Sequence, residues 1–238
     1  MVTELYLIRH GEAVSNVEPV IAGVRSDQGL TERGRRQSAL LEKRLRAEPL
    51  RADVLYVSSL RRALETGEYV ARALGLPAQV SDDLHELRPG DADGLTVDEW
   101  RARAEHEVPP DDPFQPFSPG GESWATFLLR AETTLLGLVD AHQGQTVVAV
   151  CHGGVLEASF NLAFGRGPSA RDVAFDPLNT SLTQWRHRRG PRGESSWTLV
   201  RFNDAGHLAG HLAGQLADES PRPAVPTRVD DRRTPTDQ

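Results

Sequence analysis

Two histidine–glycine pairs, at residues 10–11 and 152–153, each follow a run of apolar residues. Arg9 stands directly before the first pair, and Arg62 follows a third apolar run. A guanidinium group can bind the oxygens of a phosphoryl group in a bidentate manner, and a neutral imidazole nitrogen can attack phosphorus to give a phosphohistidine. The neighbouring Arg9 and His10 would repel each other unless an anion lay between them. These residue types predict a phosphoryl-transfer site.

The remaining groups of such a site would stabilise the charge that develops on the phosphoryl oxygens. The imidazole of His152 would donate to an equatorial oxygen, and the N–H groups of Gly11 and Gly153 would add donors because glycine lets an anion approach closely. At an effective dielectric constant of about 20, each close pair of unit charges is worth about 4 kcal/mol before desolvation. Since several such contacts would supply much of the catalysis, we expect neither a metal ion nor a cofactor.

Release of an alkoxide from a phosphate ester also needs an acid that is protonated when the substrate binds. The stretch "DDLHELRPGDADGL" offers five carboxyl groups, those of Asp82, Asp83, Glu86, Asp91 and Asp93. A carboxyl group beside a dianionic phosphate has its pKa raised by like charge and by burial. It can serve first as acid and then as base for water, a role worth about 10²–10⁴-fold in rate. The residues alone do not choose among the five.

The elements that must position these side chains follow from the apolar pattern. Strands are predicted at residues 5–8, 53–59, 76–80 and 146–154, helices at 31–47, 60–74, 124–139 and 155–164, and an edge hairpin at 181–202. This alternation predicts an α/β fold with three layers, in which helices cover both faces of a mostly parallel sheet. Arg9-His10, residues 58–62 and His152 would then meet at the carboxyl ends of the strands, where such sheets bind ligands.

Composition excludes several classes of protein. The chain has 238 residues and a formal net charge of −7, which does not favour binding to nucleic acid or to an anionic membrane. Cys151 is the single cysteine, so no disulfide forms within the chain. No signal-peptide pattern and no apolar run of transmembrane length is seen. We therefore expect a cytoplasmic protein whose partner is a small phosphate ester.

Two further segments differ from the rest of the chain. Residues 109–121 hold five prolines, which exclude a helix or a central strand and favour a lid or binding loop. Residues 206–238 are expected to be a low-complexity, disordered tail, which leaves residues 1–205 as the catalytic domain. His207 and His211, four residues apart, would form a metal pair if helical, but a frayed amphipathic turn is favoured.

The order of the motifs "LIRHGEAVSN", "SSLRRALETG", "LHELRPGDADGLT", "GGES" and "VVAVCHGGV" resembles the histidine phosphatase superfamily over about residues 3–203. The resemblance is to the branch with cofactor-dependent phosphoglycerate mutases and fructose-2,6-bisphosphatases, and it implies a phosphoglycerate-mutase-like fold. It also implies a role for individual residues: His10 as nucleophile, Arg9 and Arg62 as phosphate clamps, His152 as second phosphate-pocket histidine, Glu86 as proton donor, Asn16 as the residue that closes the pocket, and Gly23 in the substrate loop.

Departures from the family pattern shape the functional expectation. The two aromatic residues usual after the proton donor are absent from residues 87–93. Arg88 in this stretch either favours a second negative group on the substrate or is simply an exposed loop arginine. The segment from Glu86 to His152 is shorter than expected for a mutase. We therefore expect a metal-independent phosphatase of a small phosphorylated metabolite, with a phosphoglycerate mutase and a non-catalytic phospho-ligand or protein-binding module as alternatives. The oligomeric state is open, and a homodimer is one of the alternatives.

Overall fold

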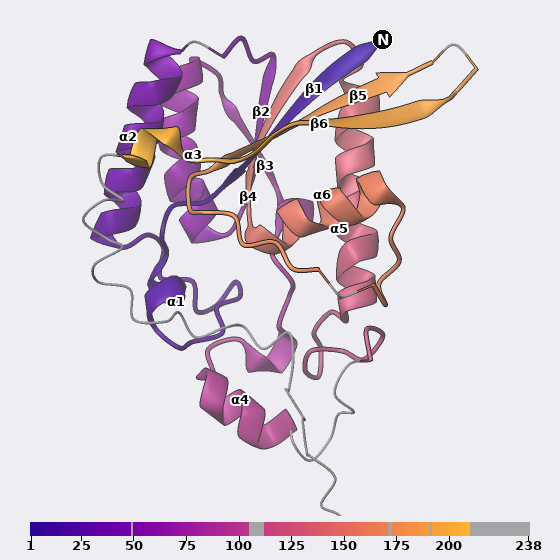
Figure 1. The fold of residues 1–238 in the computed structure, drawn as a ribbon. Coiled ribbons are helices and arrows are strands. Elements are labelled where there is room, and N and C mark those ends of the chain that lie inside the picture. The colour runs from indigo at the N-terminus through magenta and orange to yellow at the C-terminus, as the bar shows by residue number, and fades with distance from the viewer. Residues whose placement is uncertain (49, 105–111, 171–172, 191, 210–238) are drawn as a thin grey trace, which may run out of the picture.

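The computed structural model describes residues 1–48, 50–104, 112–170, 173–190 and 192–209, and they form a single six-stranded sheet with helices on both sides (Figure 1). The strands lie in the order β3-β2-β4-β1-β5-β6. Their bounds are β1 Val2–Arg9, β2 Val54–Ser58, β3 Ala78–Ser81, β4 Thr146–Cys151, β5 Leu182–Arg189 and β6 Ser195–Asp204.

Four of the strands are parallel and two are not. β1, β2, β3 and β4 run in the same direction, whereas β5 is antiparallel to β1, and β6 to β5. The predicted hairpin is therefore confirmed, with β6 as the edge strand. β1 and β4 are the two central strands, and residues 147–151 of β4 and Leu5, Leu7 and Ile8 of β1 are apolar and fully buried, because helices cover both faces of the sheet.

The four longest helices of the described residues divide into two pairs, one on each face of the sheet (Figure 1). α2 (Glu32–Ala47) and α3 (Arg61–Leu74) pack on one face around Leu41, Leu55 and Val70, while α5 (Trp124–Ala141) and α6 (Gly153–Phe164) pack on the other around Phe127 and Leu156. The three-layer α/β/α architecture expected from the sequence is thus confirmed.

Local signals explain where these helices begin and end. The hydroxyl of Thr31 accepts from the N–H of Gly34 at the start of α2, and the hydroxyl of Ser123 accepts from Thr126 at the start of α5. α3 and α6 end at Gly75 and Gly165, which adopt left-handed φ values of 68° and 65° that only glycine takes up at no cost.

Short elements lie beyond the carboxyl ends of the parallel strands (Figure 1). They are α1 (Val14–Val17), the 3₁₀ turns Asp82–Leu84 and Gly90–Ala92, and α4 (Val97–Ala104). Trp100 of α4 stacks on Phe117 with ring centroids 4.5 Å apart, which ties α4 to residues 112–122 of the proline-rich segment. The sequence pattern did not predict α1 or α4.

Ordered structure continues past the domain boundary expected after residue 205. Gly206–Leu208 form a 3₁₀ turn against α2, with Leu208 buried. His207 makes a hydrogen bond of 2.9 Å between its Nε2 and the hydroxyl of Thr180. His211 and the rest of the expected tail lie outside the described residues. Within the described ranges, no helix has the length and apolar character needed to cross a membrane.

Candidate active site

Sheet register brings the two histidine–glycine pairs to the same level. Arg9, the last residue of β1, is paired with Cys151, the last residue of β4, so the next residues, His10 and His152, emerge side by side. The N–H of His10 also donates to the carbonyl of Cys151 across 3.0 Å. The two imidazole rings have centroids 5.1 Å apart. The prediction that these two strand ends meet is therefore confirmed.

The hydrogen bond on the His10 ring decides which nitrogen is free to react. Nδ1 lies 2.7 Å from the carbonyl oxygen of Gly11, and since a carbonyl only accepts, Nδ1 carries the proton. Nε2 then has the lone pair that a nucleophile needs. Burial, followed by the positive charges of Arg62 and Arg9, holds the pKa of His10 well below its usual value. The imidazole is therefore neutral at pH 7.

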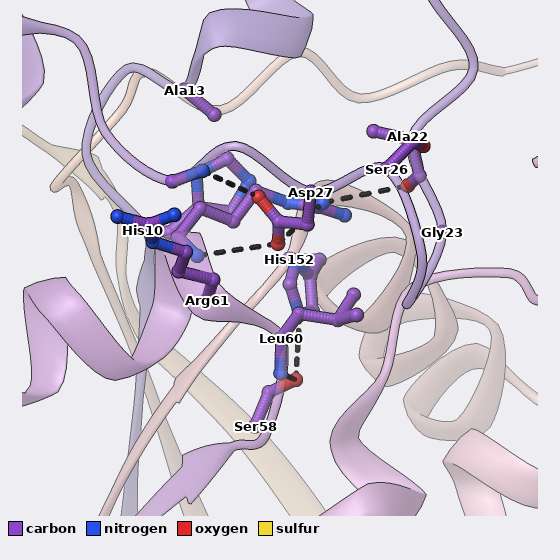
Figure 2. Close-up of polar contacts among 12 residues, drawn as sticks. His10, Ala13, Ala22, Gly23, Ser26, Asp27, Ser58, Leu60, Arg61 and His152 are labelled. Atoms are coloured by element: carbon purple, nitrogen blue, oxygen red, sulfur yellow. Dashed lines mark hydrogen bonds and ion pairs between the residues drawn. The ribbon is translucent and has the colours of Figure 1, made fainter. Parts of the chain in front are cut away.

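His152 is wholly buried and is fixed by one of its ring nitrogens. Nε2 lies 2.8 Å from the hydroxyl oxygen of Ser58 at the end of β2, a contact seen in Figure 2. Nδ1 is buried and has no hydrogen-bond partner among the described residues. Burial, together with the charge of Arg62, lowers the pKa of His152 well below its usual value. A buried nitrogen without a partner is costly, and a phosphoryl oxygen bound between the two histidines would satisfy it.

Arg62 projects from the first turn of α3 and is held by Asp27, a residue that the sequence did not single out. Oδ2 of Asp27 lies 3.1 Å from Nη1 of Arg62 and 3.2 Å from its backbone N. The side chains are only 5% and 3% exposed, respectively. Because this bond uses one edge of the guanidinium, the other nitrogens are left for a phosphoryl group.

Arg9 and the His10 backbone are supported by residues 177–180, which the sequence also did not single out. Nη1 of Arg9 donates to the carbonyl of Pro177. Nδ2 of Asn179 donates to the carbonyl of His10 at 3.0 Å, and the N–H of Thr180 donates to that of Arg9 at 2.9 Å. Thr180 has a φ of 59°, a conformation that strains a β-branched residue. Such a strained conformation persists where the surrounding contacts hold it in place, and here Thr180 supports the strand end that carries the nucleophile.

Glu86 is the acidic residue that geometry singles out from the five candidates. Its Oε2 accepts the N–H of Gly154 at 2.9 Å, at the N-terminus of α6 and two residues from His152. Asp82, Asp83 and Asp91 are exposed. Asp93 instead accepts the N–H groups of residues 23, 25 and 26. A Cβ on Gly154 would lie 2.1 Å from Oε1 of Glu86, so any larger residue there would have to displace the Glu86 carboxyl group.

Glycine at positions 11 and 23 serves packing and loop closure. The N–H of Gly11 donates to the hydroxyl of Thr66 at 2.9 Å, and a Cβ there would lie 2.6 Å from the carbonyl of Gly34. The expectation that this N–H faces the phosphate is therefore wrong. The N–H of Gly23 donates to Oδ1 of Asp93 at 2.9 Å, so Gly23 closes a loop beside the site.

The remaining two predicted residues lie at the rim of the histidine pair. Gly153 begins α6, and a Cβ there would meet Nε of Arg9 at 3.8 Å, an ordinary contact. Oδ1 of Asn16 accepts the N–H of Ala13 at 2.9 Å and the side-chain amide of Asn179 at 3.3 Å. Asn16 is thus connected to the carbonyl of His10 through Asn179.

Comparison with known proteins agrees with this arrangement. The family model for the histidine phosphatase superfamily, branch 1, matches residues 5–205. The chain belongs to the histidine phosphatase superfamily. Within this superfamily it is 34% identical to phosphoglycerate mutase-like protein 4 of Arabidopsis thaliana, over 86% of each chain. It is 32% identical to the 2,3-bisphosphoglycerate-dependent phosphoglycerate mutase of Brucella anthropi, over 75% of this chain and 88% of that one.

A solved structure of the same fold comes from a phosphatase. The mycobacterial glucosyl-3-phosphoglycerate phosphatase superposes with a TM-score of 0.70 and 26% identity, over 85% of this chain and 99% of that one. The chain thus has both the fold and the order of sequence motifs that are expected of a member of this superfamily. No group of three or more metal-ligating side chains gathers in the parts of the chain that the structure describes.

Proposed function

We propose that this protein is a metal-independent phosphatase that hydrolyses a small phosphorylated metabolite through a phosphohistidine at His10. The observation that carries the proposal is the bond from Nδ1 of His10 to the Gly11 carbonyl, which leaves Nε2 as a buried, neutral nucleophile. Arg9 and Arg62 bring the positive charge that a phosphate dianion needs. A phosphate dianion would lie between these cationic side chains. The charges that bind the ester would therefore also favour the phosphoryl-transfer chemistry.

The reaction has two steps. Nε2 of His10 attacks phosphorus, the ester P–O bond breaks, and its electron pair leaves with the alkoxide, which takes a proton from Glu86. Glu86, now a carboxylate, takes a proton from water as the water oxygen attacks the phosphohistidine. The P–N bond breaks, inorganic phosphate leaves, and His10 and Glu86 return to their starting states.

The names of the relatives suggest which substrates to test first. One is a mutase of phosphoglycerate, and the other is a phosphatase of glucosyl-3-phosphoglycerate. Both compounds contain a phosphate ester of a glyceric acid, so we propose phosphorylated hydroxy acids as the first class to test. The sequence identity to mutases also supports a second candidate function, that of a mutase that returns the phosphoryl group to the product before water reacts.

Trapping with ³²P-labelled substrate tests the proposal. We expect acid-labile label on the wild-type protein, no label on His10→Ala, and release of inorganic phosphate from at least one ester in a screen of phosphorylated metabolites. Full activity in His10→Ala would overturn the mechanism. Interconversion of 2- and 3-phosphoglycerate faster than phosphate release would favour the mutase. A protein that binds these esters but is never labelled would be a binding module.

A further inference from the structure

Arg130 and Glu122 form a partly buried ion pair beside the segment that carries Glu86. Nε of Arg130 lies 2.7 Å from Oε1 of Glu122, and Nη2 lies 2.7 Å from Oε2. The side chains are 11% and 15% exposed, respectively. Arg130 belongs to α5, and Glu122 lies just before the Ser123 cap of that helix. The pair is thus anchored on a rigid element of the fold.

The same guanidinium also binds the backbone of the residues that lead up to the acid and of the acid itself. Nη1 of Arg130 donates to the carbonyl of Asp83 at 2.8 Å and to that of His85 at 3.1 Å. Nη2 donates to the carbonyl of Glu86 itself at 3.3 Å. Three backbone oxygens within four residues therefore converge on one arginine.

Glu122 fixes the other end of this segment. Its Oε2 accepts the N–H of Arg88 at 2.9 Å, and its own N–H donates to the carbonyl of Arg88 at 2.8 Å. Residues 83–88 are consequently held at their start by Arg130 and at their end by Glu122, and these two residues also bind each other. These contacts set the backbone from which the Glu86 side chain reaches the N-terminus of α6.

Electrostatics explains why an acid would be positioned in this indirect way. An arginine bound to the Glu86 carboxyl group itself would favour the ionised form and so remove the proton that the leaving group needs. Arg130 is neutralised by Glu122 and binds the carbonyls of the segment, so it fixes the backbone without placing a cation on the Glu86 carboxyl group. A general acid must be placed closely, because a displacement of about 1 Å can cost about 10²-fold in rate.

We propose that the Glu122–Arg130 pair is a positioning device for proton transfer by Glu86, and that it acts on the backbone of residues 83–88. This inference rests on the proposed phosphatase mechanism. Its distinctive consequence is that loss of the pair slows the departure of leaving groups that need a proton and spares those that do not.

The test compares two esters in single-turnover formation of the phosphoenzyme. Glycerol phosphate has an alkoxide leaving group that must be protonated, whereas p-nitrophenyl phosphate releases a stable phenolate. We expect Arg130→Gln to slow phosphoenzyme formation from glycerol phosphate by about 10- to 100-fold, and from p-nitrophenyl phosphate by less than about threefold. Arg130→Lys, which keeps the charge but not the fork, is expected to fall between wild type and Arg130→Gln.

A double-mutant cycle tests whether the pair acts through the acid. In a Glu86→Gln background, Arg130→Gln should cause no further loss with glycerol phosphate, since the group that it positions is already gone. The matched control is Arg44→Gln, which breaks another bidentate pair, with Asp204, whose two bonds measure 2.8 Å each. Those side chains are 15% and 23% exposed, respectively. Arg44→Gln should lower stability, treat both esters alike and add to the effect of Glu86→Gln.

If Arg130→Gln does not fold, a second variant, which retains the guanidinium, tests the inference instead. Glu122→Gln leaves the positive charge of Arg130 without its carboxylate, which favours ionised carboxyl groups nearby. We expect the alkaline limb of its kcat/KM profile for glycerol phosphate to move to lower pH. An unmoved limb in this variant, equal slowing of both esters in Arg130→Gln, or additivity with Glu86→Gln would overturn the inference. A wild-type protein that forms no phosphoenzyme would instead overturn the proposed function.

Discussion

The imidazole rings of His10 and His152 lie 5.1 Å apart, tilted by 56°, and each is held by a single hydrogen bond on one nitrogen. The pKa values of both are depressed, with burial as the first cause, so both rings are neutral at pH 7. The positive charge at this strand edge therefore comes from the arginines, while the histidines supply a lone pair and a hydrogen bond. This division of roles leads to the following predictions.

The first prediction concerns the protonation of His10. Its folded-state pKa is lowered, so as pH falls through 6.5 the unfolded chain binds a proton that the folded protein does not, and His10 stays neutral and nucleophilic. NMR of ¹⁵N-labelled imidazole should show the Nδ1–H tautomer persisting below pH 6.5. The free energy of unfolding should also decrease as pH falls below 6.5. A titration midpoint at or above pH 6.5 for His10 would contradict the assigned geometry.

The second prediction concerns Asp27 as a positioning residue for Arg62. Asp27→Asn weakens a buried charged hydrogen bond, worth about 1.5–3 kcal/mol, so kcat should fall about tenfold or more. The inhibition constant of inorganic phosphate should change less, because a guanidinium without its carboxylate still attracts an anion. Steady-state kinetics with phosphate as inhibitor measures both. Equal losses in kcat and in phosphate affinity would mean that Asp27 only supports the pocket wall.

The third prediction uses two neighbouring glycines at the start of α6. Gly154→Ala puts a Cβ 2.1 Å from Oε1 of Glu86, so it should displace the acid and reduce activity by about 10²–10⁴-fold, as loss of the acid itself would. Gly153→Ala meets only ordinary contacts and should stay within about threefold of wild type. Gly137→Ala, with open space around it in α5, should raise stability by about 1 kcal/mol and leave activity unchanged. If Gly154→Ala were as active as Gly153→Ala, Glu86 would not be the acid.

The fourth prediction concerns the support behind the nucleophile. Asn179→Ala removes the amide that binds the carbonyl of His10, and loss of such a buried bond costs about 1–3 kcal/mol. Urea unfolding should show this loss, and kcat measured well below the melting temperature should also fall. A destabilised variant with unchanged kcat would limit Asn179 to a role in folding.

Much of the fold follows from local patterns in the sequence. β1, β2 and β4 contain short apolar runs covered on both faces, and α3 and α5 have clear helical periodicity. α1 and α4 were not predicted because they have four and eight residues, too few to show a periodic apolar face. β3 was predicted to begin two residues and to end one residue too early, since its exposed residues give little apolar signal.

The site could be predicted where its residues follow strands, and less well where contacts are long-range. The two histidines and Arg9 lie at strand ends, so register alone brings them together. The bond between Asp27 and Arg62 joins a loop to a helix 35 residues away, and no local pattern encodes it. The doubled glycine at 153–154 was a usable signal, because glycine disfavours helices and its presence at a helix start indicates a close neighbour.

Cys151 ends β4 beside His152 and is wholly buried. Burial, and then the negative charge of Glu86, raise the pKa of its thiol, so it stays protonated at any physiological pH. Reaction with peroxide or with an alkylating reagent requires an exposed thiolate, and this sulfur is neither exposed nor ionised. Dephosphorylation by His10 would therefore persist under oxidative stress that silences phosphatases whose nucleophile is a cysteine.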